Sequence, residues 1–158
     1  MSTLRERLAS KARRRCLVPV QVADPGPARQ ALESAATALA LAATSEDTAG
    51  AAGALQAAVE AAQADLEACT LEIELQAPPA AAADAVLSAH LDADGAPDYD
   101  AALPDLLTLC AVDESMQDAD AWRELLSSDN WGPNDVSGLR LGVLYLVADP
   151  MRPLVPKG

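Results

Sequence analysis

The stretch Cys69–Gln76 reads CTLEIELQ, and it decides the fold of this chain. Apolar side chains alternate there with polar ones: Leu71, Ile73 and Leu75 with Glu72, Glu74 and Gln76. Because side chains of a strand point to opposite faces in turn, this alternation predicts a half-buried β-strand with a polar outer face.

A second short strand is predicted before it. Leu17, Val18, Val20 and Val22 supply its apolar side chains, and Pro19 restricts it to an edge or an irregular pairing. The sequence DPGP that follows predicts the end of this strand and the start of a helix.

Two helices are predicted between the strands, at residues 27–43 and 49–68, joined by TSEDT (residues 44–48). Each has an apolar stripe at 4-3-4 spacing: Ala28, Leu32, Ala35 and Leu39 in the first, and Leu55, Val59, Ala62 and Leu66 in the second. This spacing is typical of two helices packed as a hairpin, with alanine allowing close approach. Because a hairpin returns the chain to its start, the two strands are expected to lie antiparallel.

The charges are distributed unevenly along the chain. Residues 1–29 hold seven basic and two acidic side chains, a net charge of +5, and the remainder holds four basic and 22 acidic ones, a net charge of −18. Thr3–Glu6 (TLRE) predicts a capping box that starts a helix, with Lys11 and Arg13–Arg15 in its last turns. The acidic bulk repels nucleic acid and anionic membranes, so neither is an expected partner. It suits solubility or a basic protein partner.

The C-terminal half is expected to be helical. Apolar residues at helical spacing predict helices from Pro79 to Leu91, around Leu103–Cys110, around Trp122 and from Pro133 to Val147. Five large residues are expected to form one apolar cluster: Leu106, Trp122, Leu125, Leu139 and Leu144. Large apolar residues at this spacing are usually core, but they are also the candidate partner-binding residues, and the sequence leaves the two readings open.

Together these elements predict a predominantly helical α+β fold. We expect a short antiparallel two-strand sheet with an inserted helical hairpin and a C-terminal helical group. The expected segments are 1–77 (first helix, strand, hairpin, strand), 78–98 (helix and acidic linker) and 99–158 (C-terminal helical subdomain and tail).

The acidic stretch after His90 resembles a calcium loop only superficially. Counted from Asp92, an EF-hand would need a glycine at the sixth position and a glutamate at the twelfth, where this chain has Pro97 and Leu103. An acidic linker punctuated by proline and glycine is therefore expected, without a metal site.

No catalytic motif is found in the sequence. Its single histidine, His90, and three widely spaced cysteines, Cys16, Cys69 and Cys110, offer neither a catalytic triad nor zinc spacing. A P-loop and a dinucleotide-binding fingerprint are also missing. We expect a protein that is not an enzyme, has no cofactor and keeps reduced thiols in the cytoplasm. No apolar run reaches the roughly 20 residues that span a membrane.

Three stretches resemble the tail assembly chaperones of actinobacterial tailed phages. They are APPAAAADAVLSAHL (residues 77–91), YDAALPDLLTLCAV (99–112) and DAWRELL (120–126), the last followed by Trp131 and an apolar helix. With the strands and hairpin they cover most of residues 17–147. Residues 79–91 lack the aromatic often found there in the family, and SGLRLGVLYLV (137–147) contains more glycine and β-branched residues than usual.

The resemblance implies a chaperone that binds the tape-measure protein in the host cytoplasm and keeps it soluble during tail assembly. It also implies a longer form made by ribosomal frameshifting near the end of the reading frame. The main alternative is a structural head–tail adaptor or other ring component, a homo-oligomer in which the basic N-terminal part of one copy meets the acidic body of the next. A secretion-type chaperone is a third hypothesis.

Overall fold

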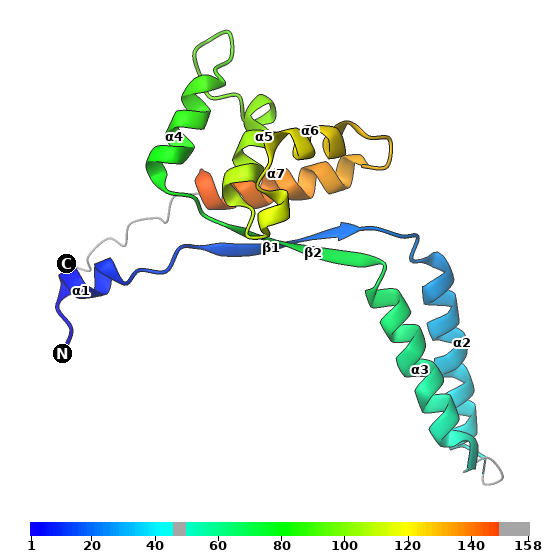
Figure 1. Cartoon of the computed structure of the whole chain (residues 1–158). Helices are drawn as coiled ribbons and strands as arrows, with labels where there is room; N and C mark the ends of the chain where they lie inside the picture. Colours follow the sequence, from blue (N-terminus) through cyan, green and yellow to red (C-terminus); the bar gives the residue numbers. More distant parts are fainter. Residues whose placement is uncertain (46–49, 149–158) are drawn as a thin grey trace, which may run out of the picture. The chain divides into compact units, whose positions relative to one another are not determined.

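Two strands pair where the alternation predicts them. The computed structural model describes residues 1–45 and 50–148, and in it β1 (Arg15–Gln21) and β2 (Thr70–Gln76) form a two-stranded antiparallel sheet (Figure 1). The Ala77 N–H donates to the Arg14 carbonyl at one end, and the Val22 N–H donates to the Cys69 carbonyl at the other, both at 2.8 Å. The same number of residues separates these two hydrogen bonds on each strand, so no bulge lies between them.

This register explains how the sheet accepts Pro19. Arg14 and Val22 belong to hydrogen-bonded pairs. The backbone N–H and C=O groups of β1 residues an even number of positions from them therefore also point toward β2. Pro19 lies an odd number of positions away, where a backbone N–H would point out of the sheet. Its missing donor therefore removes no ladder bond.

The described part of the chain contains seven α-helices besides the sheet, which confirms the predominantly helical α+β class. They are α1 (Leu4–Ala9), α2 (Gly26–Ala43), α3 (Ala52–Glu67), α4 (Ala80–Ala89), α5 (Tyr99–Cys110), α6 (Ala119–Ser127) and α7 (Pro133–Val147), with a 3₁₀ turn η2 (Glu114–Met116) before α6.

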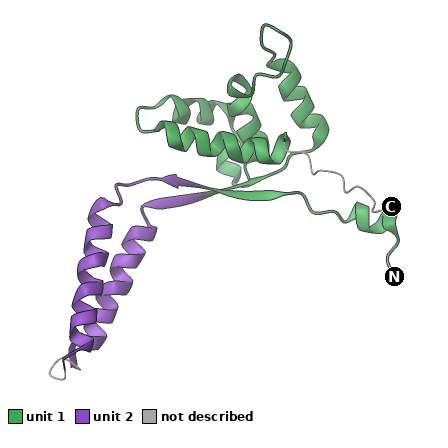
Figure 2. Ribbon diagram, turned by 180° about the vertical axis from the view of Figure 1, so that it is seen from behind, with its two compact units in different colours: residues 1–18, 73–158 green, residues 19–72 purple. Residues whose placement is uncertain are grey.

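The chain divides into two compact units that differ from the three consecutive segments expected (Figure 2). Unit 1 comprises residues 1–18 and 73–158, and unit 2 comprises residues 19–72. The expected boundary after residue 77 falls inside unit 1, because the ends of β1 and β2 pack with the helices that follow.

Unit 1 has a core supplied by α5, α6, α7 and the end of β2. Its most deeply buried large side chains, at most 1% exposed, are Leu75, Leu106, Leu107, Cys110, Trp122, Leu139 and Val143. The Trp122 indole N–H donates to the Met116 carbonyl at 2.7 Å, so the ring is buried with its polar atom satisfied. A short bridge joins Leu75 to Ala111 and extends the sheet beside β2.

A glycine brings α7 close to the strands within unit 1. A Cβ placed on Gly142 would lie 2.7 Å from Cγ2 of Val18 and 3.4 Å from Cδ1 of Leu75. Only glycine therefore fits here without displacement, which accounts for the glycine-containing last helix noted in the sequence.

Unit 2 is the expected hairpin of α2 and α3. The predicted stripe residues are half-buried, with Ala62 buried, so the 4-3-4 pattern does mark the seam between the helices. Its base is closed by Cys69, whose Sγ contacts the carbonyls of Asp65 (3.3 Å) and Asp24 (3.8 Å).

The start of the chain departs from the expectation in one respect. The capping box of Thr3 and Glu6 is present, but α1 ends at Ala9, before the basic cluster. Lys11 and Arg13–Arg15 are therefore not in its last turns. Arg15 instead begins β1 and pairs with Glu74 at 2.8 Å, because strand pairing holds the chain extended there.

The acidic segment is a closed turn between α4 and α5, not an extended linker. Asp92 Oδ1 accepts hydrogen bonds from the N–H groups of Asp94 and Ala96, both at 2.9 Å. Gly95 has a φ of 81°, which glycine adopts without strain. A bridge between Leu91 and Pro97 closes the loop.

Candidate functional site

The five candidate partner-binding residues lie in unit 1, and three of them are interior. Leu106, Trp122 and Leu139 are 0% exposed, while Leu125 and Leu144 are half-buried. The core interpretation holds for the first three, and their side chains offer no docking surface in this structure. A binding surface has to be sought elsewhere.

The single histidine belongs to a chain of polar contacts. His90 Nε2 lies 2.7 Å from Oδ2 of Asp105, whose Oδ1 accepts from Arg123 at 2.9 Å. Arg123 also pairs with Asp120 at 2.7 Å. These contacts tie the end of α4 to α5 and α6. Within residues 1–45 and 50–148, no group of three or more His, Cys, Asp or Glu residues is arranged to hold a metal.

The cysteines are free thiols with different environments. Burial raises the pKa of Cys110 to about 12, and the neighbouring Cys16 adds to the rise. Burial also raises the pKa of Cys16 above its ordinary value. Because the thiolate is the nucleophile, these shifts make both side chains poor nucleophiles near neutral pH.

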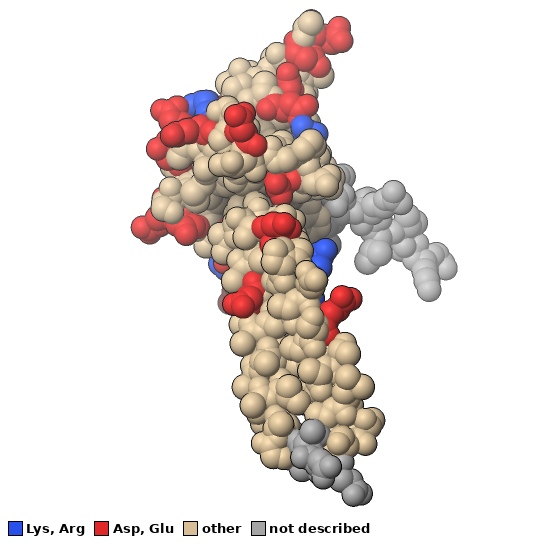
Figure 3. All heavy atoms as spheres, turned by 90° about the vertical axis from the view of Figure 1, so that its right-hand side faces the viewer, with Lys and Arg blue, Asp and Glu red and all other residues tan. Residues whose placement is uncertain are grey.

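The hairpin of unit 2 carries a surface without charge. Residues 34–45 and 50–59 of the hairpin contain no Asp, Glu, Lys or Arg, in a chain of net charge −13; Glu46 and Asp47 lie between these ranges, outside the described residues. We call this surface the neutral arm. Leu41 is 66% exposed on it, and its remaining surface is mostly alanine. In Figure 3 the described lower part of the hairpin shows no acidic or basic side chain on the face in view.

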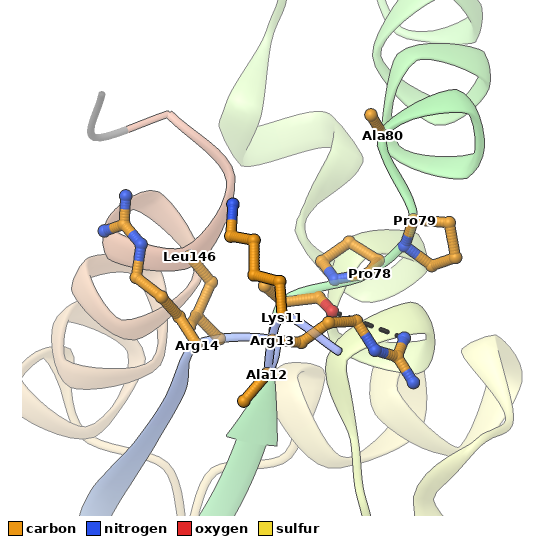
Figure 4. A pocket seen from close by; sticks show the side chains of 9 residues that line it. Lys11, Ala12, Arg13, Arg14, Pro78, Pro79, Ala80 and Leu146 are labelled. Atoms are coloured by element: carbon orange, nitrogen blue, oxygen red, sulfur yellow. Dashed lines mark hydrogen bonds between the residues drawn. The ribbon is translucent and has the colours of Figure 1, made fainter. Parts of the chain in front are cut away.

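Unit 1 carries a hollow that is lined by basic side chains. Lys11, Arg13 and Arg14 line a space of about 500 Å³ together with Pro78, Pro79 and Leu146. In Figure 4 the Lys11 ammonium reaches up between Leu146 and the proline pair, with the two arginines on either side. We call this site the basic hollow.

Two of its cations are held by other groups of unit 1. Arg14 donates to the Tyr145 carbonyl at 3.0 Å, with its guanidinium 4.9 Å from the Tyr145 ring centroid. Arg13 donates to the Ala77 carbonyl at 3.4 Å. The arginine side chains are thus oriented before any ligand arrives.

Sequence reasoning missed the basic hollow, although a signal for it existed. Antiparallel pairing of β1 and β2 places the residues before β1 beside those after β2. The three cations therefore meet the proline pair that starts α4, and this follows from the predicted strands once their register is known.

None of the helices in the described ranges has the length and apolarity needed to cross a bilayer. Comparison with protein-family models, curated proteins and solved structures finds no match to this chain. The functional argument therefore rests on the residues and their geometry.

Proposed function

We propose that this protein is an assembly chaperone of the phage tail type, which binds the tape-measure protein in the host cytoplasm and keeps it soluble while the tail is built. The proposal is a binding function without catalysis. The observation that carries it is the neutral arm.

A surface without charge is unusual in so acidic a chain. Charged side chains keep a protein soluble and apart from other chains, and the rest of this surface has many. The neutral arm instead presents alanine methyl groups and Leu41 on two helices. Small side chains let another helix approach to an interaxial distance near 8 Å.

A long helical client fits such a surface. Before assembly, a tape-measure chain exposes apolar helical stripes that would otherwise associate with one another. The neutral arm covers a stripe by helix–helix packing, while the acidic remainder supplies the charge that keeps the complex soluble. The resemblance in residues 77–126 supports the same class of function.

The test is co-expression with the tape-measure protein of the same phage, followed by a solubility and pull-down assay. We expect the client to be insoluble alone and soluble in complex with this chain. Leu41→Glu should abolish the rescue, because it places a charge on the neutral arm. Leu141→Glu is the matched control, since Leu141 is also 66% exposed but lies on α7.

The proposal is supported if the client becomes soluble with Leu141→Glu but stays insoluble with Leu41→Glu. A client that neither binds nor gains solubility overturns it, and equal rescue by both variants removes the neutral arm as the binding surface.

A structural ring component is the second candidate, favoured by the basic hollow in an otherwise acidic chain. Purified particles separate the two functions. An adaptor remains in the assembled particle, whereas an assembly chaperone is absent from it.

A further inference from the structure

The basic hollow selects for a particular kind of occupant. Lys11 and Arg13, both exposed, supply positive charge at its rim, and Pro78 and Leu146 supply an apolar wall. A second, smaller hollow shares Pro78, Ala80 and Leu146 with the basic hollow and is otherwise lined by Ala83, Asp84, Leu87 and Val147. An occupant must therefore combine carboxylates with an apolar side chain.

The turn between α4 and α5 has this combination. We call residues 91–98 the acidic loop. It presents Asp94 beside Leu91, which is 53% exposed. The carboxylates of Asp92 and Asp98 add negative charge while they accept N–H hydrogen bonds within the loop and at the start of α5. The side chain of Asp92 and the Leu91–Pro97 bridge hold it in one conformation. A preformed loop loses little conformational entropy when it docks.

The base of the acidic loop is also fixed. The Asp98 N–H donates to the His90 carbonyl at 2.8 Å, and the His90 ring is held by Asp105. The loop therefore projects from the end of α4 in a defined direction.

The hollow and the loop lie at opposite ends of one helix. Pro79 and Ala80, at the start of α4, line the basic hollow, whereas the acidic loop follows its last residue, Ala89. Ten helical residues span about 15 Å, so the loop does not reach the hollow of its own chain. The helix dipole adds positive charge at the basic end and negative charge at the acidic end.

We propose that copies of this chain associate head to tail, with the acidic loop of one copy docked in the basic hollow of the next. Leu91 enters the apolar part of the hollow, and Asp94 faces Lys11 and Arg13. Every residue involved belongs to unit 1, so this contact is independent of the neutral arm and of any client. Such a contact is heterologous, so a pair of copies still has one free hollow at one end and one free loop at the other for further copies.

The first test measures the mass of the purified chain against concentration by sedimentation velocity. We expect the mass to rise with concentration and the rise to weaken strongly in 1 M salt, where the screening length falls to about 3 Å. A chain that stays monomeric up to about 1 mM, the range of weak complexes, overturns the proposal.

The decisive test mixes two variants. Lys11→Glu/Arg13→Glu reverses the charge of the hollow, and Leu91→Ser/Asp94→Ser removes the apolar and the charged side chain of the loop without reversing its charge, so each variant alone should be monomeric. Mixed together they retain one intact hollow and one intact loop, and they should form a 1:1 dimer that grows no further. Dimerisation through a single symmetric patch would give no such rescue.

Matched controls carry the same change in charge away from the contact. Arg5→Glu/Arg7→Glu on α1 and Glu60→Gln on α3 should self-associate like the unmodified chain. If they fail as the contact variants do, net charge governs association and the specific contact is wrong. If the chain is monomeric but a client binds and is lost in Lys11→Glu/Arg13→Glu, the hollow is a client site and self-docking is overturned.

Discussion

The two units of this chain are stabilised in different ways. Unit 1 contains all of the large side chains that are less than 2% exposed, among them Trp122, Leu106 and Leu139. Among the described residues of unit 2, three are less than 8% exposed, namely Val20, Ala62 and Cys69. Its helices are held by a seam of half-buried alanine and leucine. Two-helix hairpins with little buried area are marginal alone, so unit 2 is expected to open at a lower free energy than unit 1.

This contrast separates folding from binding within one chain. Unit 1 has a packed interior and a charged surface, whereas unit 2 has little interior and no charged side chain in residues 34–45 and 50–59. A weakly packed hairpin can adjust to a helical partner at small cost, because few buried contacts have to be rearranged. A bound partner in turn buries the apolar side chains that the hairpin leaves exposed, Leu41 among them.

Each unit contains a buried thiol that reports its opening. Cys110 is 1% exposed in unit 1, and Cys69 is 7% exposed in unit 2. In a Cys16→Ala background, the rate of labelling by a thiol reagent at each position measures the opening of that unit. The following predictions use these two rates.

Trp122→Ala should have the largest effect. The substitution removes a fully buried indole and the hydrogen bond to Met116, and such losses cost about 3–5 kcal/mol. We expect labelling of Cys110 to accelerate by roughly a hundredfold or more, with far less change at Cys69. Trp131→Ala is the control, since Trp131 is only half-buried, and it should have a smaller effect. Equal acceleration at both cysteines would show that the units open together and that the contrast is wrong.

Gly142→Ala should have an intermediate effect, also confined to unit 1. The new methyl would lie 2.7 Å from Val18 Cγ2, and valine is stiff about χ1. Overpacking of this kind costs about 1–3 kcal/mol, seen as a lower thermal midpoint and faster labelling of Cys110.

Gly138→Ala on the same helix is the matched control. Its methyl would lie 3.6 Å from Val18 Cγ1, an ordinary contact, so the gain in helix propensity should make it neutral or stabilising by up to about 1 kcal/mol. Substitution by alanine should thus lower the stability of unit 1 at Gly142 and leave it unchanged or raise it at Gly138. The same sign at both positions would contradict the close approach of α7 to the strands.

The parts of this fold that sequence predicts are those set by local periodicity. The alternation of Leu71, Ile73 and Leu75 locates β2, and the 4-3-4 stripes locate the seam of the hairpin, because each pattern repeats within a few residues. The capping box of Thr3 is visible for the same reason. The sequence could also anticipate that a cluster containing Trp122 would be buried.

The remaining features depend on contacts between distant residues. The early end of α1 follows from pairing across the sheet, and the basic hollow follows from the register that brings Lys11 to Pro78. The closed acidic loop depends on where the Asp92 carboxylate points. No local pattern distinguishes Gly142, which faces Val18, from a glycine in an open position.

Gly53→Ala should have the smallest effect, and it tests the other side of the comparison. Gly53 lies near the start of α3, and a Cβ there meets nothing within 4 Å. Alanine restricts the unfolded chain and favours the helix, a gain of roughly 0.5–1 kcal/mol. Labelling of Cys69 should therefore slow by about two- to fivefold, while labelling of Cys110 stays unchanged. If Cys110 slows by the same factor, stabilising α3 also stabilises the core around Trp122, and the chain unfolds as one cooperative body. If only Cys69 responds, the hairpin opens by itself, and a client that binds the neutral arm should slow the same thiol further.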